Sequence, residues 1–450
     1  MDNPHNTCVL LLNLPPQSLG GIDLISFQTT PRFQGVKHLP PGWHFIFTGT
    51  SASSSERHGA WFKITGGDSD GTPEVHIKKW DADKEELVKE TSSTEIVRWQ
   101  SSLASIWKDR LTPYRQSASN SGEAEEESVD WALLTDCISE AMLSRIIRDG
   151  TPDHWVLTSA SSAKRDEDDI PGLSGSEARD ALEHEKELHL LPINLKQTWR
   201  TGATGRERTE AAQDKSWALG ELITEHCADG NEMEILGEMQ FCFLMILTLN
   251  NYSCLEQWKR ILSLLFTCKS AVVERTQLFV HALTTLKLQL QHCEDAEGGL
   301  LDLREEGAPL LVDLLRRFKK GLNELQGTGK QDVLDELEEL ENFMKERYGW
   351  NLEDSFARTG MLELEDGEQV EMDISGYDED LDESGEYAPM VVELTQEQLR
   401  ALSIDDGVGE RIDHAMTLPE RMKMEDENES ENDEEYEEDD QDLEDMDARY

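Results

Sequence analysis

The chain has 450 residues and a formal net charge of −52, from 94 acidic and 42 basic side chains. Residues 351–450 alone hold 37 acids and 6 bases, so this segment supplies −31 of the total. Non-specific affinity for nucleic acids comes mainly from Lys and Arg side chains that displace counterions from phosphates. The charge therefore argues against direct contact with RNA or DNA and favours protein partners.

Residues 8–90 alternate short β-rich runs with turn signals, a pattern typical of an antiparallel sandwich or barrel. Pro40, Pro41 and Gly42 cannot continue a central strand, because proline has no amide hydrogen, so they mark a corner between strands. From Ser93 the apolar spacing becomes helical, and it is helical again over residues 133–146. We expect these two helices to pack on the sheet.

Two polar stretches interrupt this pattern. Residues 117–128, SASNSGEAEEES, have nothing to bury and are expected to form a surface loop. Residues 159–190 are rich in Ser, Gly and charge and are expected to link two domains. The sequence therefore predicts a β-rich domain at 1–158 and a helical domain at 191–352.

From about residue 213 the chain reads as successive antiparallel helices with short connections, over 231–252, 254–268, 271–293, 310–325 and 330–350. Residues 241–249 are apolar nearly all round, which predicts a position in the middle of the bundle. A solenoid of helix pairs is the alternative, but the helices differ in length and have no fixed period. The fold class we predict is α+β: an antiparallel β-sandwich-like domain with packed helices, an all-α domain and a disordered acidic tail.

Three motifs that resemble sites of known chemistry each lack a necessary residue. HEKELH (184–189) places its histidines five residues apart, whereas a zinc protease needs a spacing of four, so a solvated helix is the better interpretation. GTGK (327–330) has Glu324 and Gln331 where a phosphate-binding loop needs Gly and Ser or Thr. DSDG (68–71) has Lys79 where a calcium loop needs its closing glutamate. We expect no catalytic residue, metal site or cofactor, and a hydrolase is the least favoured reading.

Seven cysteines, an odd number with no C-x-x-C pair, predict buried free thiols in a reducing compartment. The amino terminus lacks the positive region of a signal peptide, and the longest apolar run is about half of a membrane crossing. These features predict a soluble intracellular protein. The basic stretch RRFKK (316–320) is compatible with a solvated helix face or a weak import signal. Six tryptophans are expected to be core residues: Trp43, Trp61, Trp80, Trp99, Trp107 and Trp258.

The acidic segment contains one apolar stretch, EYAPMVVELT, at 386–395. In an extended strand Met390, Val392 and Leu394 fall on one face, and Pro389 disfavours helix for the residue before it. The stretch is therefore suited to add a strand to another protein's sheet edge. The alternative is an edge strand on the protein's own amino-terminal sheet. We place an acidic linker at 353–385, a partner-binding strand at 386–396 and the acidic tail at 397–450. The predicted partner-binding residues are Pro389, Met390, Val391, Val392, Glu393 and Leu394.

Over residues 8–395 the sequence resembles the a1-cistron splicing factor family, called AAR-two. The most specific stretches are GVKHLPPGWHF (35–45), the helical block with GEMQF and EQWKR (237–260), and APMVVEL (388–394). The loop 117–128 and the tail beyond about 396 have no counterpart in the family pattern.

The resemblance implies a β-sandwich-like domain joined to an all-helical one. It also implies an assembly chaperone of the U5 small nuclear ribonucleoprotein (U5 snRNP) in pre-mRNA splicing, present in cytoplasm and nucleus and monomeric before docking. Such proteins bind the particle's large scaffold protein, through its RNase H-like and Jab1/MPN-like domains, and hold off the RNA helicase until maturation. The alternative is an acidic nuclear chaperone for basic proteins that acts through its tail.

Overall fold

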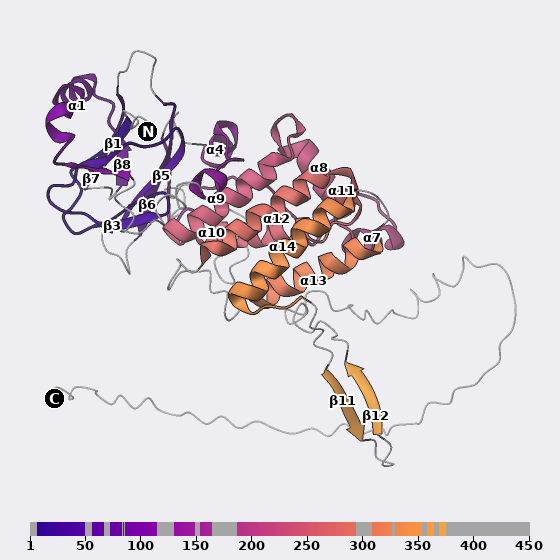
Figure 1. The fold of residues 1–450 in the computed structure, drawn as a ribbon. Helices are drawn as coiled ribbons and strands as arrows, with labels where there is room; N and C mark the ends of the chain where they lie inside the picture. Colours follow the sequence, from indigo (N-terminus) through magenta and orange to yellow (C-terminus); the bar gives the residue numbers. More distant parts are fainter. Residues whose placement is uncertain are drawn as a thin grey trace, which may run out of the picture. The chain divides into compact units, whose positions relative to one another are not determined.

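The computed structural model describes residues 7–49, 56–66, 73–82, 84, 86–114, 130–148, 154–163, 187–293, 308–325, 329–352, 358–363 and 369–374. The chain divides into two compact units, residues 1–356 and 357–450. The first unit contains two β-sheets followed by a helical body (Figure 1), which confirms the predicted fold class. The predicted surface loop at 117–128 and the acidic tail lie outside the described residues.

The amino-terminal region consists of two five-stranded sheets with the orders β8-β7-β1-β4-β9 and β10-β6-β5-β2-β3. The predicted corner at Pro40 and Pro41 is confirmed, because it lies between β4 of the first sheet and β5 of the second. Gly42 has a φ of 138°, a conformation that only glycine adopts easily. The strands are β1 (Thr7–Leu12), β2 (Leu19–Ile22), β3 (Ile25–Gln28), β4 (Gly35–Lys37), β5 (Gly42–Gly49), β6 (Arg57–Ile64), β7 (Glu74–Asp81), β8 (Glu86–Lys89), β9 (Leu111–Pro113) and β10 (Trp155–Thr158).

Strand β1 is apolar without interruption from Cys8 to Leu12 because both of its faces are covered. Val9 and Leu11 belong to the core between the two sheets. Cys8, Leu10 and Leu12 point to the opposite side and pack with apolar residues of helix α1 (Ser93–Ile106). Alternate residues of a strand face opposite sides of its sheet, so a strand covered on both sides reads as a continuous apolar run.

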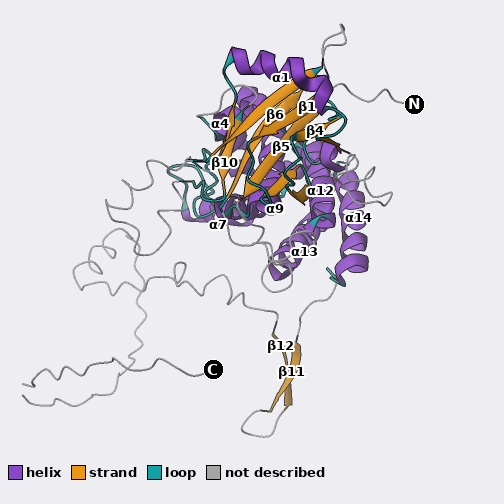
Figure 2. Cartoon of the chain, turned by 90° about the vertical axis from the view of Figure 1, so that its left-hand side faces the viewer, coloured by secondary structure: helices purple, strands orange, loops and turns teal. Residues whose placement is uncertain are grey.

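The second sheet also has two covered faces. Ile46, Ala60 and Phe62 face the core between the sheets, whereas Phe45 and Trp61 belong to a core shared with the helical body. The order of layers is therefore α1, first sheet, second sheet and helical body; Figure 2 shows α1 along one side of the sheets.

The first sheet is mixed, whereas the sequence predicted antiparallel strands throughout. β1 pairs in parallel with β7, and β4 pairs in parallel with β9. All pairs of the second sheet are antiparallel. Parallel strands require a long connection. Strands β2 to β6 lie between β1 and β7 in the chain, and β5 to β8 with α1 lie between β4 and β9. The pattern of apolar residues along one strand does not reveal which distant strand pairs with it.

The two predicted helices near the sheets differ in outcome. α1 begins where expected, with the Ser92 side chain accepting a hydrogen bond from the Glu95 amide. The helix expected over 133–146 is replaced by a shorter one, α4 (Glu140–Ile146). Ser139 has an extended backbone and caps α4 through the Met142 amide, so a continuous helix through residue 139 is excluded.

The helical body begins at residue 205, somewhat before the predicted 213. The five predicted helices are present, but the one expected over 271–293 is divided at Arg275, whose φ of −129° and ψ of 44° are not helical. The elements are α7 (Gly205–Gln213), α8 (Ser216–His226), the 3-10 helix η1 (Ala228–Gly230), α9 (Met233–Leu249), α10 (Tyr252–Leu265), α11 (Ser270–Glu274), α12 (Thr276–Gln291), α13 (Ala308–Glu324) and α14 (Lys330–Tyr348).

Helix α9 lies in the middle of the body, as the sequence predicted. Fifteen of its 17 residues are buried, and it contacts α10, α12, α4 and β6. Asn250 ends the helix in the left-handed conformation, and the Asn251 side chain caps α10. The two asparagines thus form the tight turn that places α10 beside α9.

The second unit contains one described element, a hairpin of β11 (Arg358–Glu363) and β12 (Gln369–Ile374). The strands pair antiparallel, with Arg358 opposite Ile374 and Glu363 opposite Gln369. This hairpin lies within the range 353–385, for which the sequence predicted an acidic linker.

The interpretation of the tryptophans as core residues is confirmed for Trp43, Trp61, Trp80 and Trp258, which are buried. Trp99 and Trp107 are half-buried and pack on the core beneath α1. Among the described helices, none combines the length and apolar character that a membrane crossing requires.

Candidate functional site

The predicted partner-binding residues 389–394 lie outside the described residues, so their role stays a prediction. The structure does describe the folded body that precedes them. α14 ends at Tyr348, and Gly349 follows in the left-handed conformation. Leu352 is buried, and its carbonyl accepts a hydrogen bond from Arg316 on α13 at 3.2 Å. The described body therefore remains packed up to residue 352.

A buried carboxylate on α9 holds three parts of this body together. Glu238 is fully buried, and its Oε2 accepts a hydrogen bond from Arg145 of α4 at 2.8 Å. Its Oε1 accepts from the Leu191 amide and from Gln257 of α10, both at 2.8 Å. A buried charge is tolerated only when it is paired and hydrogen-bonded. Glu238 thus fixes α4, the segment around Leu191 and α10 on α9.

The neighbouring residues on α9 complete this junction. Gln240 accepts a hydrogen bond from the Cys137 amide at 3.0 Å and donates one to Asp136 at 2.6 Å. A Cβ atom at Gly237 would lie 2.4 Å from the Cys137 carbonyl oxygen, so this approach requires glycine. Phe241 stacks on Trp61 of β6 with ring centroids 6.1 Å apart. The stretch GEMQF (237–241) therefore joins the two halves of the first unit.

The carboxyl end of α9 forms a second junction. The last carbonyls of a helix have no partner within the helix. Here Arg57 of β6 donates to the Thr248 carbonyl at 2.9 Å, and Ser159 donates to the Leu249 carbonyl at 2.7 Å. Asn251 donates to the Ser161 carbonyl at 2.7 Å. The end of β10 and the end of α9 thus satisfy each other's polar groups.

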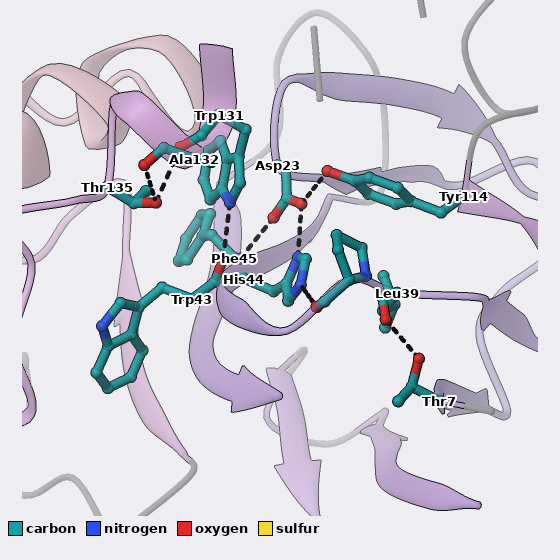
Figure 3. Close-up of polar contacts among 11 residues, drawn as sticks. Thr7, Asp23, Leu39, Trp43, His44, Phe45, Tyr114, Trp131, Ala132 and Thr135 are labelled. Carbon is teal, nitrogen blue, oxygen red and sulfur yellow. Dashed lines mark hydrogen bonds and ion pairs between the residues drawn. The ribbon is translucent and has the colours of Figure 1, made fainter. Parts of the chain in front are cut away.

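An Asp-His-Tyr group inside the sandwich is the arrangement closest to an acid–base site (Figure 3). Asp23 accepts hydrogen bonds from His44 Nδ1 at 2.7 Å and from the Tyr114 hydroxyl. His44 Nε2 lies 2.8 Å from the Pro40 carbonyl oxygen. Carboxylate and carbonyl oxygens only accept, so the arrangement favours a protonated imidazole, in which both ring nitrogens donate.

The environment of His44 explains this charge. Burial lowers its pKa, but the Asp23 carboxylate and the Pro40 carbonyl outweigh burial, and the pKa is raised above its ordinary value. The side chains of His44 and Asp23 are each 1 % exposed, so a substrate does not reach them. The group instead ties the corner after Pro40 to the turn that carries Asp23.

The cysteines are suited to packing rather than to chemistry. All seven are free, six are buried, and Cys137 is half-buried. Burial raises the pKa of Cys8 to about 12 and that of Cys227 to about 11, and burial together with Asp136 raises that of Cys137 to about 12. Nucleophilic attack and metal binding require the thiolate. The described residues also contain no group of three or more metal-ligating side chains.

Two sequence motifs can be followed in part. Lys330, the last residue of GTGK, donates to the Leu325 carbonyl at 2.6 Å and begins α14. Its ammonium group thus has a backbone partner in the body. The described end of HEKELH, residues 187–189, is not helical, so the interpretation as a solvated helix is wrong for these residues. The His189 amide instead donates to the Ile146 carbonyl, which draws the segment onto the end of α4.

The surface of the helical body exposes large apolar side chains at two adjacent helices. Trp217 on α8 is 44 % exposed and Val273 on α11 is 41 % exposed. The two helices meet nearby, because the Ala271 amide donates to the Ser216 hydroxyl at 2.9 Å. Single exposed apolar residues are ordinary, but a pair on helices that touch is a candidate contact point for a partner.

A cleft of about 340 Å³ lies in the sheet-rich region, between residues of β3, the loop after it, the turn after α1, and β9. Its lining comes from two segments, 27–33 and 108–112, that are far apart in the sequence. Neither segment contains a recognisable motif. Sequence reasoning missed this site because only the fold brings the two segments together.

Two family models match the chain. One, described as the AAR2 N-terminal domain, matches residues 5–148, and the other, the AAR2 C-terminal repeat region, matches residues 190–353. A protein AAR2 homolog of Mus musculus is 27% identical over 310 residues, 63% of this chain and 74% of that protein. A protein AAR2 homolog of Caenorhabditis elegans is 24% identical over 63% of this chain and 78% of that protein.

A third similar protein is the A1 cistron-splicing factor AAR2 of Saccharomyces cerevisiae, 26% identical over 57% of this chain and 69% of that protein. The two family models follow each other in chain order: the first covers β1 to α4, and the second covers all helices of the helical body. The chain therefore belongs to the AAR2 family of splicing factors.

Proposed function

We propose that this protein is an assembly chaperone of the U5 snRNP in pre-mRNA splicing. It binds the particle's large scaffold protein, through the RNase H-like and Jab1/MPN-like domains of that protein, and keeps the RNA helicase away until maturation. The observation that carries the proposal is the match of both AAR2 models, together with a yeast relative named as a splicing factor. The protein acts by binding, in the cytoplasm and the nucleus, and not by catalysis.

The folded body supports a role in binding. Its buried polar side chains, such as Glu238, Gln240 and His44, are committed to internal hydrogen bonds. One core extends from the second sheet through α9 into the other helices. Such a body presents a fixed surface to a partner and needs no rearrangement of its own core. We assign to it the first and larger contact with the scaffold.

The strand at 386–396 supplies the second contact. Burying three apolar side chains gives roughly 1.5 to 3 kcal/mol each, and about five hydrogen bonds add roughly 1 kcal/mol each. Ordering six or seven residues costs about 1 to 2 kcal/mol per residue, so the sum is near zero. The strand therefore contributes only when the body is already docked and the effective concentration is high. Weak, conditional binding suits a chaperone that must leave.

The test is a binding titration of full-length protein against the separated RNase H-like and Jab1/MPN-like domains and against both together. Changing Val391→Asp and Val392→Asp places a charge on each face of the strand and is expected to weaken binding at least tenfold. The matched control, Ile404→Asp with Val408→Asp, adds the same charge to the same acidic segment outside the strand. Equal affinities for the two variants would contradict the strand mechanism.

A deletion of residues 396–450 separates the proposal from the alternative of an acidic chaperone. The scaffold proposal predicts little change in scaffold binding, because the body and residues 386–395 of the strand remain. An acidic chaperone would lose nearly all of its binding to basic partner proteins, because the deletion removes the 21 acids of residues 401–450. Loss of scaffold binding on this deletion would favour the alternative.

A further inference from the structure

The cleft in the sheet-rich region lies beside one edge strand of each sheet. β3 is the last strand of the second sheet, and β9 is the last strand of the first. Residues of both strands line the cleft. In the part of the chain that the structure describes, no strand pairs with the outer edge of either one. Unpaired backbone groups at a sheet edge can accept another strand.

The floor of the cleft is apolar. Phe27 on β3 and Phe33 in the following loop are half-buried, and their ring centroids are 4.9 Å apart. Leu111, the first residue of β9, is buried beside them. The backbone holds this geometry, because the Gln34 amide donates to the Arg110 carbonyl at 3.0 Å. The cleft can therefore take one apolar side chain.

The rim of the cleft is basic. Arg32, Lys108 and Arg110 are exposed and line the cleft, against a single carboxylate, Asp109. Within the described residues no hydrogen bond or ion pair engages the side chains of these three cations. By contrast, Arg316 and Lys319 of the RRFKK stretch are paired with Asp313 and Glu341. Three neighbouring cations without a partner among the described residues are unusual in a chain with a net charge of −52.

We propose that this cleft binds an extended acidic peptide segment of a partner protein, with one apolar side chain on the Phe27 and Phe33 floor. Acidic side chains of the peptide pair with Arg32, Lys108 and Arg110. Its backbone pairs with the open edge of β3, in the manner of an added strand. The inference does not depend on the scaffold protein of the proposed function.

Charge and shape favour a peptide over a nucleic acid. Residues 1–114, which include all residues that line the cleft, carry 13 acids and 11 bases, so this stretch is nearly neutral, while the whole chain is strongly acidic. A long polyanion would meet the repulsion of the whole chain, whereas a short acidic peptide meets mainly the local charge, because salt screens beyond about 10 Å. An open strand edge also offers hydrogen bonds that suit a peptide backbone.

The test uses the full chain and fluorescein-labelled probes, with binding followed by fluorescence anisotropy. The probe is the peptide Asp-Glu-Val-Phe-Val-Glu-Asp, which is acidic, prone to extended structure and apolar at its centre. Three control peptides each remove one feature: lysine replaces the acids, alanine replaces the phenylalanine, or proline replaces both valines. Decauridylate is the nucleic-acid control. The full chain is used because its own acidic residues can compete with the peptide for the three cations. Binding of the peptide to the full chain is therefore a stricter test than binding to a shortened protein.

We expect the acidic peptide to bind and each control to bind less. Each exposed ion pair contributes a few-fold, so Arg32→Glu, Lys108→Glu and Arg110→Glu together are expected to weaken binding about tenfold. High salt should have a similar effect on the parent protein. The matched control reverses three exposed cations elsewhere in the same region, Lys79→Glu, Lys84→Glu and Arg98→Glu, and should leave binding unchanged. Far-ultraviolet circular dichroism checks that both variants fold.

The proposal is overturned if the acidic peptide does not bind, or if both triple variants weaken binding equally. Tighter binding of decauridylate than of the peptide would also overturn it, because the cleft would then be a nucleic-acid site. Peptide binding that withstands the charge reversal would place the peptide elsewhere. Scaffold binding is measured in a separate titration. A negative result with the acidic peptide therefore does not contradict the proposed function, and a negative result with the scaffold domains does not contradict this inference.

Discussion

Glu238 on α9 and Arg145 on α4 form an ion pair with an N–O distance of 2.8 Å at the junction of the two halves of the first unit. The Glu238 side chain is fully buried and that of Arg145 is 25 % exposed. The same carboxylate holds the Leu191 amide and Gln257. The Glu238 side chain therefore couples the positions of α4, the segment around Leu191 and α10 to that of α9.

Glu238→Ala is expected to destabilise the protein by about 3 kcal/mol, because breaking a buried pair leaves the partner groups unsatisfied. The measurement is the free energy of unfolding in urea. Glu339→Ala is the control, since Glu339 is 65 % exposed in its pair with Lys287 and an exposed pair contributes at most about 1 kcal/mol. Similar losses for the two variants would contradict the assigned role of Glu238.

Two glycines in helices provide a matched comparison of close packing. Gly237→Ala places a Cβ 2.4 Å from the Cys137 carbonyl oxygen and is expected to cost about 1 to 3 kcal/mol. Gly220→Ala on α8 meets nothing within 4 Å, and it should stabilise by about 0.5 to 1 kcal/mol because alanine favours the helix. Thermal unfolding of both variants checks the opposite signs. A stabilised Gly237→Ala protein would show that α9 and the Cys137 turn are not in close contact.

The raised pKa of His44 predicts a pH dependence of stability. A group whose pKa is higher in the folded state stabilises fully below its unfolded pKa, near 6.5 for histidine, and this stabilisation is lost as the pH rises through the folded value. The free energy of unfolding of the parent protein should therefore exceed that of His44→Gln most near pH 5 to 6, and this difference should shrink toward pH 9.

Urea unfolding at several pH values measures this difference. His281→Gln on α12 is the control, because His281 is exposed and its replacement removes a histidine without disturbing the Asp23 group. A difference in free energy of unfolding between the parent protein and His44→Gln that is the same at pH 5 and pH 9 would mean that His44 is not a charged partner of Asp23.

The cysteines are expected to be unreactive in the folded protein. With a pKa raised to about 12 by burial, Cys8 is a thiolate in only roughly one molecule in 10⁴ at pH 8, and the thiolate is the reactive form. Iodoacetamide should therefore label the native protein slowly at all seven positions and rapidly in urea, as counted by mass spectrometry. A Ser105→Cys variant, altered at an exposed position of α1, should label quickly at that position alone. Fast labelling of any native cysteine would show that the core around it opens.

The sequence alone predicted much of the secondary structure and the order of a β-rich part followed by a helical part. The unbroken apolar run of β1, the corner at Pro40 and the burial of α9 all follow from local patterns, because periodicity records which faces of an element are covered. The same reasoning failed where the backbone of a single residue interrupts a helical pattern of apolar residues. Ser139 caps α4 and removes half of the helix expected over 133–146, and the non-helical backbone of Arg275 divides the helix expected over 271–293.

What the sequence by itself determined is which side chains must be buried, where the chain turns and where its charge lies. The tertiary structure decided what those side chains meet: β1 beside β7 in parallel, Gln240 on the Cys137 amide, and Phe27 facing the segment that carries Arg110 across a cleft. The physical reason is that hydrophobic burial is non-directional, so a pattern of apolar residues fixes the buried face but not its partner. Partners are selected by close packing and by hydrogen bonds between segments about a hundred residues apart.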